Sequence, residues 1–436
     1  MREGRLPEDW KHSPLGELGE ITTGSTPPTS MPKNYGGEIP FVGPGDLGDF
    51  RSVTLSSKRI TEFGASQSRT VEPNTVFVSC IGILGKTGQA KHRMAFNQQI
   101  NAISPYPSKV DPKFLYYLCD TLGTTLEKLA GLQVIPIVNK REFSTITRSV
   151  PCSIPEQQKI AQILDTLDTQ IQKTEALIAK LEKIKEGLLQ DLLTRGIDQN
   201  GQLRPTPEQA PALYKESALG LIPKEWEIRS IAESGVKLID GDRGANYPSD
   251  QDFTAGSGHC VFLSARNVTR SGFRFDTRQF VSKDKDRVLG TGKLVRNDVI
   301  VTTRGTVGNF AHYNHSIPFD HIRINSGMLI LRSAQSNLLP EFLYLSLKEH
   351  LFDRENSRKG SGSAQPQLPA RDFQSFLLVI PDQEEQQKIM ALSSMKDRTI
   401  KAETQKHQKL LSLKSALMDD LLTGNVRVTP LLKDAV

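Results

Sequence analysis

The sequence contains few of the residues that build disulfide scaffolds or metal centres, and it has no long apolar run. Among its 436 residues are four cysteines and eight histidines. The cysteines (Cys80, Cys119, Cys152 and Cys260) form no C-x-x-C pair, which argues against a disulfide framework or a thiolate zinc site. No apolar stretch approaches the roughly 18 residues of a membrane span, and the N-terminus does not resemble a signal peptide. We therefore expect a cytoplasmic protein with reduced thiols and no membrane contact.

Enzyme and metal-binding motifs are incomplete as well. The stretch GPGDLG from Gly43 has the spacing of a dinucleotide-binding turn, but Pro44 lies inside it. GILGKTG contains the GKT of a phosphate-binding loop, but Cys80 stands where that loop requires its first glycine. The H-x2-H-x5-H group from His312 has Asp320 as its one acidic neighbour, which is a poor ligand set. We therefore expect a chain that is not an enzyme, holds no metal and binds no cofactor.

The charge balance is mildly basic, and the chain is long. There are 55 lysines and arginines against 49 aspartates and glutamates, which gives a net charge of +6. This balance is compatible with a polyanionic partner, although many cytosolic proteins are equally basic. A chain of this length exceeds one hydrophobic core, so we expect about two to three domains.

The clearest positive signal is an internal repeat. The residues EQQKI occur at Glu156 and again at Glu385, and each copy is followed at the same distance by DLLT. The match extends further: LPEDW echoes IPKEW, IPFVGPGDL echoes CVFLSARNV, and PNTVFVSCIGILG echoes RNDVIVTTRGTVG, with Gly82 over Gly305. We interpret the chain as two diverged copies of one unit, each a mixed domain followed by a long helix.

Each EQQKI begins a stripe of apolar residues at spacings of three and four, which predicts a long amphipathic helix close to a heptad pattern. Pro155 suits the first helical turn, and Gly196 and Gly424 mark where the helices should end. At ~1.5 Å per residue each helix is about 60 Å long. The residues predicted to form the seam are Ile160, Leu164, Leu167, Ile171, Ile178, Leu181, Leu188, Leu192, Ile389, Leu392, Ile400, Leu410, Leu413, Leu417 and Leu421.

The two helices have matching starts. Ser153 with Glu156, and Asp382 with Glu385, have the spacing of a capping box, in which each side chain satisfies the other residue's backbone N–H. Polar helices of this length are unstable alone, and their equal lengths make them natural partners. We expect an antiparallel coiled coil that joins two mixed domains related by a pseudo-two-fold axis. The alternative is that each helix packs only on its own domain.

The remaining segments are typical of α+β domains. They are rich in Gly, Pro and Thr and contain short β-branched runs such as TVFVS, DVIVTT and FLLVI. A helix is expected near Pro112–Leu129, with a counterpart near Pro340–Phe352. The predicted organisation is a first mixed domain at 1–152, a first helix at 153–197, a linker at 198–215, a second mixed domain at 216–381, a second helix at 382–424 and a tail at 425–436.

Basic and amide residues surround the glycine turns of both mixed domains. Arginine can grip guanine with two donors, and asparagine or glutamine can do the same to adenine, while glycine turns let backbone N–H groups approach phosphates. The alternative for any single residue is an ordinary solvated loop. The residues predicted to contact DNA are Ser79, Lys86, Lys91, Arg93, Asn97, Gln98, Gln99, Arg266, Asn267, Arg270, Thr303, Arg304, Arg323, Arg358, Lys359 and Gln365.

Taken together, these motifs resemble the specificity subunit of type I restriction-modification systems. The resemblance rests on PEQQKI and EEQQKI, on DLLTRG and DLLTG, and on IPFVGPGDL, FLSARNV, IPKEW and AQPQL, and it spans nearly the whole chain. It implies two target recognition domains that read the halves of a split, asymmetric sequence in double-stranded DNA, with the coiled coil as a ruler. It also implies assembly with two methyltransferase subunits that bind S-adenosylmethionine and with motor-nuclease subunits that use ATP and Mg²⁺.

One departure and two alternatives accompany this resemblance. The Gln-Pro-Gln pattern of the family is present only in the second copy, which has AQPQLPAR where the first copy reads QVIPIVNK, so a contact from Gln365 is not transferred to Ile135. One alternative is a single-chain DNA methyltransferase or nuclease with fused specificity domains, and the missing catalytic motifs count against it. The other is a structural coiled-coil protein, which predicts no salt-dependent DNA binding.

Overall fold

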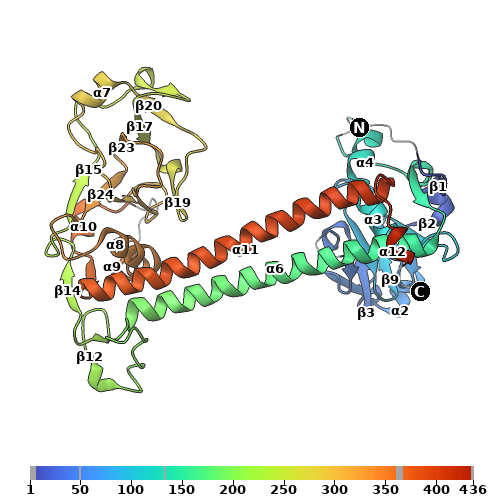
Figure 1. Ribbon diagram of the computed structural model, residues 1–436, viewed down its shortest axis with the longest axis horizontal. Coiled ribbons are helices and arrows are strands. Elements are labelled where there is room, and N and C mark those ends of the chain that lie inside the picture. Colours follow the sequence, from blue (N-terminus) through green and yellow to red (C-terminus); the bar gives the residue numbers. More distant parts are fainter. Residues whose placement is uncertain (1–5, 49–50, 132–133, 360–366, 434–436) are drawn as a thin grey trace. The chain divides into compact units, whose positions relative to one another are not determined.

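The computed structural model describes residues 6–48, 51–131, 134–359 and 367–433. The chain divides into two compact units (Figure 1): unit 1 comprises Met1–Leu177 and Glu403–Val436, and unit 2 comprises Ile178–Ala402. This division does not follow the sequence repeat. Each unit contains the mixed domain of one copy together with the C-terminal part of the other copy's long helix.

Unit 1 contains two main sheets and several short helices. Its strands are β1 Trp10–Pro14, β2 Gly19–Thr23, β3 Tyr35–Val42, β4 Ser52–Val53, β5 Lys58–Ile60, β6 Thr70–Val71, β7 Val76–Ser79, β8 Thr87–Ala90, β9 Met94–Phe96, β10 Ile100–Pro105 and β11 Thr147–Pro151. Its short helices are α1 Leu15–Leu18, α2 Glu62–Ser66, α3 Pro112–Asp120, α4 Gly123–Ala130 and α5 Lys140–Thr145. The sheets have the orders β2-β10-β7-β8-β4 and β5-β3-β9-β6, and β1 pairs antiparallel with β11.

Unit 2 repeats this plan with shorter strands. Its strands are β12 Tyr214–Lys215, β13 Ile222–Pro223, β14 Glu227–Ser230, β15 Lys237–Asp240, β16 Thr254–Ala255, β17 Cys260–Leu263, β18 Val268–Thr269, β19 Gly272–Phe273, β20 Gln279–Val281, β21 Val299–Thr302, β22 Phe310–His312, β23 Ile322–Ile324, β24 Met328–Arg332 and β25 Leu377–Ile380. Its short helices are α7 Lys283–Val288, α8 Pro340–Ser346, the π-helix Leu347–Leu351, α9 Phe352–Lys359 and α10 Ala370–Gln374. The sheets have the orders β15-β24-β21-β22 and β16-β20-β17-β23.

The α+β class is confirmed in both units. The runs TVFVS, DVIVTT and FLLVI form β7, β21 and β25 as predicted. The helix expected over Pro112–Leu129 is interrupted, because α3 ends at Asp120 and α4 begins at Gly123. This break brings Gly123 against the β7–β8 loop, where a Cβ added to Gly85 would lie 2.6 Å from the Gly123 Cα.

The two long helices begin and end close to the predicted residues. Helix α6 spans Ile154–Thr194 and helix α11 spans Gln383–Thr423, and each has 41 residues. Gly196 and Gly424 follow them with φ of +64° and +79°, the left-handed conformation in which glycine ends a helix. Among the helices of the described ranges, none combines the length and apolarity that crossing a bilayer requires.

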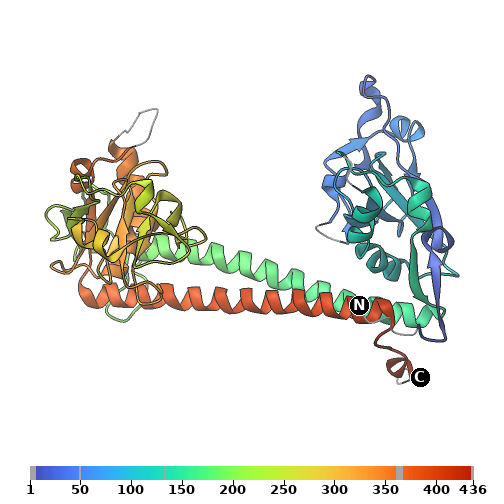
Figure 2. The same ribbon diagram turned by 90° about the horizontal axis from the view of Figure 1, so that it is seen from above.

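The helices lie side by side and antiparallel within each unit (Figure 2). In unit 1, His407 Nε2 lies 2.8 Å from Glu175 Oε1, and Lys414 Nζ lies 2.6 Å from Asp168 Oδ1. Later residues of α6 therefore pair with earlier residues of α11, as antiparallel helices do. In unit 2, Lys185 pairs with Asp397 at 2.6 Å, and the backbone N–H of Ile197, just beyond α6, donates to Glu385 at 2.8 Å. The predicted antiparallel pairing is therefore confirmed in both units.

Most of the predicted seam is at least partly buried, but Leu413 is not. Leu413 is 47% exposed. The position that faces α6 is occupied instead by Lys414, which lies four residues after Leu410. The Lys414 ammonium pairs with Asp168 and lies 5.7 Å from the centre of the Tyr117 ring. The prediction was wrong there because it required apolar residues, whereas this seam also accepts a long polar side chain whose stem packs.

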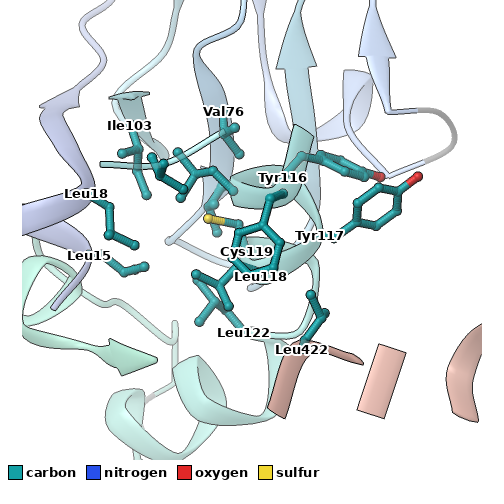
Figure 3. Close-up of a cluster of buried hydrophobic side chains, with 14 of the residues drawn as sticks. Leu15, Leu18, Val76, Ile103, Tyr116, Tyr117, Leu118, Cys119, Leu122 and Leu422 are labelled. Carbon is teal, nitrogen blue, oxygen red and sulfur yellow. The ribbon is translucent and has the colours of Figure 1, made fainter. Parts of the chain in front are cut away.

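Each helix end contributes to the core of the other copy's domain. In unit 1, Leu421 and Leu422 of α11 join the cluster around Tyr117 and Cys119, and Figure 3 shows Leu422 among the side chains of this cluster. In unit 2, Leu192 and Leu193 of α6 join the cluster around Trp226 and Phe373, and all four side chains are buried. The alternative in which each helix packs only on its own domain is therefore excluded.

The first two residues of EQQKI have distinct structural tasks. Gln157 is fully buried; its Oε1 accepts from the Asp111 N–H at 2.7 Å, and its Nε2 donates to the carbonyls of Lys109 and Pro151. Gln386 does the same in unit 2 with the Leu339 N–H, at 2.9 Å, and with the carbonyls of Asn337 and Pro381. The glutamine thus fixes the start of each long helix to the loop before α3 or α8.

The glutamate that precedes this glutamine binds the segment that follows the other copy's long helix. The Glu385 carboxylate accepts from both terminal nitrogens of Arg204 and from Trp226 Nε1 at 3.0 Å, and Arg204 also bonds Glu225 at 2.7 Å. We call Glu385, Arg204, Glu225 and Trp226 the unit 2 clasp. The predicted capping box is only half formed here. Asp382 accepts from the Glu385 N–H, but the Glu385 carboxylate binds Arg204 and Trp226 and does not bond back to the Asp382 N–H.

Unit 1 has an equivalent arrangement. Arg427 donates to Glu156 through Nε at 2.8 Å and through Nη2 at 3.0 Å, and it also bonds Asp9. We call Glu156, Arg427 and Asp9 the unit 1 clasp. Asp9 precedes Trp10 as Glu225 precedes Trp226, so both clasps use corresponding residues of the two copies.

The segments predicted to be a linker and a tail take part in these contacts. The segment 198–215 belongs to unit 2, contributes the buried Arg204 and pairs β12 with β13. The tail 425–436 contributes Arg427 to the unit 1 clasp, buried Val428 to the unit 1 core, and helix α12 Pro430–Lys433.

Candidate nucleic-acid interface

Each unit carries a loop of the same design between two antiparallel strands. We call residues 79–86, between β7 and β8, the unit 1 glycine loop, and residues 302–309, between β21 and β22, the unit 2 glycine loop. In unit 1, the Ser79 Oγ accepts from the Lys86 N–H at 2.9 Å, and the Ser79 carbonyl accepts from the Gly85 N–H at 2.9 Å. In unit 2, Thr302 makes the same two bonds to Asn309 and Gly308, both at 3.0 Å.

The glycines of these loops are required by backbone conformation. Gly82 and Gly85 have φ of +78° and +79°, and Gly305 and Gly308 have +76° and +88°. Side-chain-bearing residues rarely adopt this region, whereas glycine does so at no steric cost. The repeated glycines therefore shape a turn, and the phosphate-binding loop suggested by GKT is not needed to explain them.

A second segment lies along each loop in the same register. We call residues 137–138 in unit 1, and residues 367–368 in unit 2, the lining segment. The Val138 N–H donates to the Cys80 carbonyl at 2.9 Å, and the Leu368 N–H donates to the Thr303 carbonyl at 3.0 Å. Isolated antiparallel bridges join Ile81 to Ile137 and Arg304 to Gln367. The two interfaces thus share one backbone framework, while the side chains on it differ.

The unit 2 glycine loop presents arginine and glutamine. Arg304 and Gln367 are exposed, and with Arg243, Asp240 and the buried Thr303 they line a pocket of about 220 Å³. Arg243 is held beside them by bonds to Asp240, at 3.1 Å, and to the Ser326 carbonyl, at 3.3 Å. Arg243 was not among the predicted residues, because it lies far from the glycine turn in the chain.

A hairpin of β18 and β19 is tied to this loop. Asn309 Nδ2 donates to the Val268 carbonyl at 3.0 Å, and the exposed Arg266 and Arg270 flank that residue. Asn267, predicted to contact DNA, is instead 3% exposed and donates to the carbonyls of Arg274 and Thr277. Its amide is needed to close the turn, so the prediction for Asn267 was wrong.

Arg323 was also wrongly assigned to DNA. Its side chain is 6% exposed, its Nε bonds Asp286 at 2.5 Å, and its terminal nitrogens donate to backbone carbonyls. Lys293 bonds the same carboxylate, and His259 lies 3.4 Å from it. Arg323 therefore neutralises a buried aspartate and does not reach the surface.

This ion cluster makes a prediction about acid stability. Burial alone would raise the pKa of Asp286, but hydrogen bonds from Lys293 and Arg323 outweigh it and lower that pKa from 3.8 to about 2. A lowered folded-state pKa stabilises the fold above about pH 4, by about 2 kcal/mol, and this contribution is lost as the pH falls through 2. Denaturant unfolding of unit 2 at pH 5 and pH 2.5 should show this loss, and Asp286→Asn should reduce it. An identical loss in the variant would contradict the assignment.

The unit 1 glycine loop is bordered by amides. The Cys80 N–H donates to the Gln99 carbonyl at 2.7 Å, and a Cβ added to Gly82 would lie 4.0 Å from Gln99 Nε2. Asn97 Nδ2 donates to Gln99 Oε1 at 2.9 Å, and Thr26 donates to Gln98 at 2.6 Å. The half-buried Lys86 packs its stem near Gly48, so Lys86, Asn97, Gln98 and Gln99 gather at one end of β8.

Two other predicted residues of unit 1 lie elsewhere. Lys91 and Arg93 follow the last residue of β8, at the end opposite the glycine loop, and Arg93 pairs with Glu62 at 3.0 Å. Ser79 is fully buried and closes the loop through its hydroxyl, and Thr303 is 6% exposed. The Ser79 hydroxyl shapes its loop, and Thr303 bonds through its backbone N–H and carbonyl, so the structure does not support the DNA contacts predicted for these two buried side chains.

Three further residues were predicted to contact DNA. Arg358 and Lys359 belong to α9, and Gln365 lies outside the described residues.

Two buried cysteines, Cys80 in the unit 1 glycine loop and Cys260 at the start of β17, are poor nucleophiles. Burial raises the pKa of Cys80 to about 11 and that of Cys260 to about 12, which keeps both thiols protonated and poorly nucleophilic. Within the described ranges, no group of three or more His, Cys, Asp or Glu side chains is placed to hold a metal ion. What the loops do offer is exposed donors and apolar side chains on a fixed backbone, which suits recognition.

Comparison with known proteins points in the same direction. The profile of the type I restriction modification DNA specificity domain matches residues 7–183 and 223–412. The MjaIX specificity subunit of Methanocaldococcus jannaschii is 25% identical over 98% of this chain and 96% of its own length. The EcoBI specificity subunit of Escherichia coli is 21% identical over 88% of this chain and 78% of its own.

Two solved structures have a similar fold. A chain from a type I restriction-modification complex aligns with a TM-score of 0.63 at 16% identity, covering 97% of this chain and 100% of the other. The type I S subunit from M. genitalium aligns with a TM-score of 0.55 at 16% identity, covering 97% and 98%.

Proposed function

Because the chain belongs to the family of type I restriction-modification DNA specificity domains, we propose that it reads one bipartite, asymmetric DNA sequence for its complex. The observation that carries the proposal is the pair of glycine loops. They share one hydrogen-bond framework but present Arg304 and Gln367 in unit 2 against Ile81 and Ile137 in unit 1. Identical frameworks with different side chains suit two readers of different half-sites.

The division of labour follows from the same residues. The half-buried Lys86 in unit 1 and the exposed Arg266 and Arg270 in unit 2 supply phosphate contacts that position the chain, and side chains on the loop reach base edges and specify the sequence. Because the two loops differ, the recognised site is not palindromic. Helices α6 and α11 act as the ruler that fixes the number of base pairs between the half-sites.

Catalysis and cofactors are assigned to partners. We propose that two methyltransferase subunits bring S-adenosylmethionine to the adenines of the site, and that motor-nuclease subunits bring ATP and Mg²⁺. Since the substrate is cellular or invading DNA, the complex works in the cytoplasm. This chain then contributes sequence choice and the scaffold on which the other subunits assemble.

A reconstitution experiment separates this function from its rivals. The full chain should bind a bipartite duplex together with its methyltransferase partner, and log affinity should fall against log salt with a slope of roughly −0.9 per phosphate contacted. With S-adenosylmethionine, adenine methylation should require both proteins. Methylation by the chain alone would favour a single-chain enzyme, and absence of salt-dependent binding would favour a structural coiled coil.

Arg304 provides the sharpest single-residue prediction. If its guanidinium donates to guanine O6 and N7, Arg304→Ala should weaken binding by about 1–3 kcal/mol and relax the preference at one position of one half-site. Binding measurements on duplexes carrying each base at every position would show this. Arg287→Ala removes another exposed arginine of unit 2, on α7, and should leave the preference unchanged. Equal weakening on all sequences would make Arg304 a phosphate contact.

A further inference from the structure

We infer that the reader in unit 1 recognises A·T base pairs through apolar contact of Ile83 and Ile137 with thymine C5-methyl groups, at the same edge of the loop where unit 2 presents Arg304 and Gln367. The inference rests on the proposed function, because it requires that the glycine loops face DNA. It adds to that function the chemical class of base that each half-site presents.

The positional equivalence is given by hydrogen bonds. Cys80 and Thr303 each accept at their carbonyl from the lining segment, at 2.9 and 3.0 Å, and the bridge that follows joins Ile81 to Ile137 in unit 1 and Arg304 to Gln367 in unit 2. Ile81 therefore occupies the place of Arg304, and Ile137 the place of Gln367. An isoleucine has no donor for guanine O6 or N7, so unit 1 cannot use the contact proposed for unit 2.

The apolar side chains at this edge are unusually exposed. Ile83 is 60% exposed and Ile137 is 42% exposed, and the neighbouring Val134 and Ile135 are 103% and 59% exposed. Both Ile83, in the glycine loop, and Ile137, in the lining segment, belong to the framework already described. A cluster of exposed aliphatic side chains of this kind marks a contact surface.

The amides beside these aliphatic side chains fit adenine, the partner of thymine in the same base pair. Gln99 Nε2 lies 4.0 Å from the position of a Cβ on Gly82, and its Oε1, which can accept two bonds, already accepts one from Asn97. Glutamine and asparagine read adenine through N6 and N7, and the thymine methyl is the apolar feature of the major groove. Amides and isoleucines at one loop are therefore complementary to the two bases of one A·T pair.

A DNA partner explains the difference between the units better than a protein partner does. A protein that bound corresponding surfaces of both copies would meet isoleucines in one and arginine with glutamine in the other. The two halves of an asymmetric DNA site differ in this way by definition. The half-buried Lys86 at the same end of β8 also supplies the positive charge that a phosphate backbone needs.

The test is thymine-to-uracil replacement, which removes only the C5-methyl group. Sites are first selected from randomised duplexes by the full chain with its methyltransferase partner, and the half-site whose preferences change in Arg304→Ala is assigned to unit 2. Uracil at a contacted thymine of the other half-site should weaken binding about fourfold, the effect of one buried methyl group. The variant Ile83→Ala/Ile137→Ala should bind thymine and uracil duplexes equally.

A matched control guards against a general effect of removing apolar surface. Phe63, 43% exposed on α2, adjoins Glu62, which pairs with Arg93 at the other end of β8, so Phe63→Ala should keep the thymine preference. Equal binding of thymine and uracil by the native chain, or a thymine preference that survives in the double variant, would overturn the inference while leaving the proposed function intact. Absence of any bipartite selection would overturn both.

Discussion

Replacing Glu385 by alanine is expected to destabilise unit 2 by about 3–5 kcal/mol, because it leaves the buried guanidinium of Arg204 without its main partner. The Arg204 and Glu385 side chains are 8% and 6% exposed. The same substitution removes the acceptor of Trp226 Nε1 and of the Ile197 N–H, both in the buried interior. Since Ile197 follows α6 and Glu385 lies in the first turn of α11, the loss also removes a contact between the two helix ends.

The measurement uses the two tryptophans of the chain, which lie one in each unit. In a Trp10→Phe background the remaining indole, Trp226, reports the unit 2 clasp directly during denaturant unfolding. Glu384→Ala, one residue away, removes a carboxylate whose pairing with Lys388 is exposed and should change stability by less than about 0.5 kcal/mol. Equal, small effects of both substitutions would show that the clasp does not hold unit 2 together.

Lengthening both long helices together is expected to move the spacing between half-sites, whereas lengthening one should abolish specific binding. Seven residues inserted after Leu177 lie between Glu175 and Lys185, and seven inserted after Thr404 lie between Asp397 and His407. Both ion pairs can then form. One heptad adds about 10 Å of helix at ~1.5 Å per residue, which corresponds to about three base pairs at ~3.4 Å each.

The single insertion is the matched control. With seven extra residues in α6 alone, the Glu175–His407 and Lys185–Asp397 pairs cannot both keep their register, because the two helices between them differ in length. Affinity for the native site should fall at least tenfold. Selection from duplexes with variable spacers measures both effects, and an unchanged spacer preference in both variants would refute the ruler.

Much of the fold could be predicted from periodicity and repetition. The long helices, their ends at Gly196 and Gly424 and their antiparallel partnership all followed from apolar spacing and from two copies of equal length. These features are local or repeated, so one sequence shows them directly. The break between α3 and α4 was missed because it serves a contact between Gly85 and Gly123, which no local pattern encodes.

The candidate site was harder to predict, because polar residues have two possible uses. Asn267 and Arg323 have the donors that base contacts need, yet these donors already bond to backbone carbonyls and to Asp286 inside unit 2. Ile83 and Ile137 were not predicted because they are apolar, and only their exposure at the unit 1 glycine loop makes them candidate contacts. Which use a side chain has depends on tertiary neighbours, and these cannot be read from a single sequence.

The proposed function requires that one chain carries two different readers, which together specify one split DNA sequence. The most direct measurement is a map of methylated adenines in the genome of a cell that has the complete system, made with and without this chain. The account predicts methylation in one split motif with two unlike half-sites and a constant spacer, and its disappearance when the chain is removed. Methylation that persists without the chain, or that occupies a contiguous or palindromic motif, would contradict it.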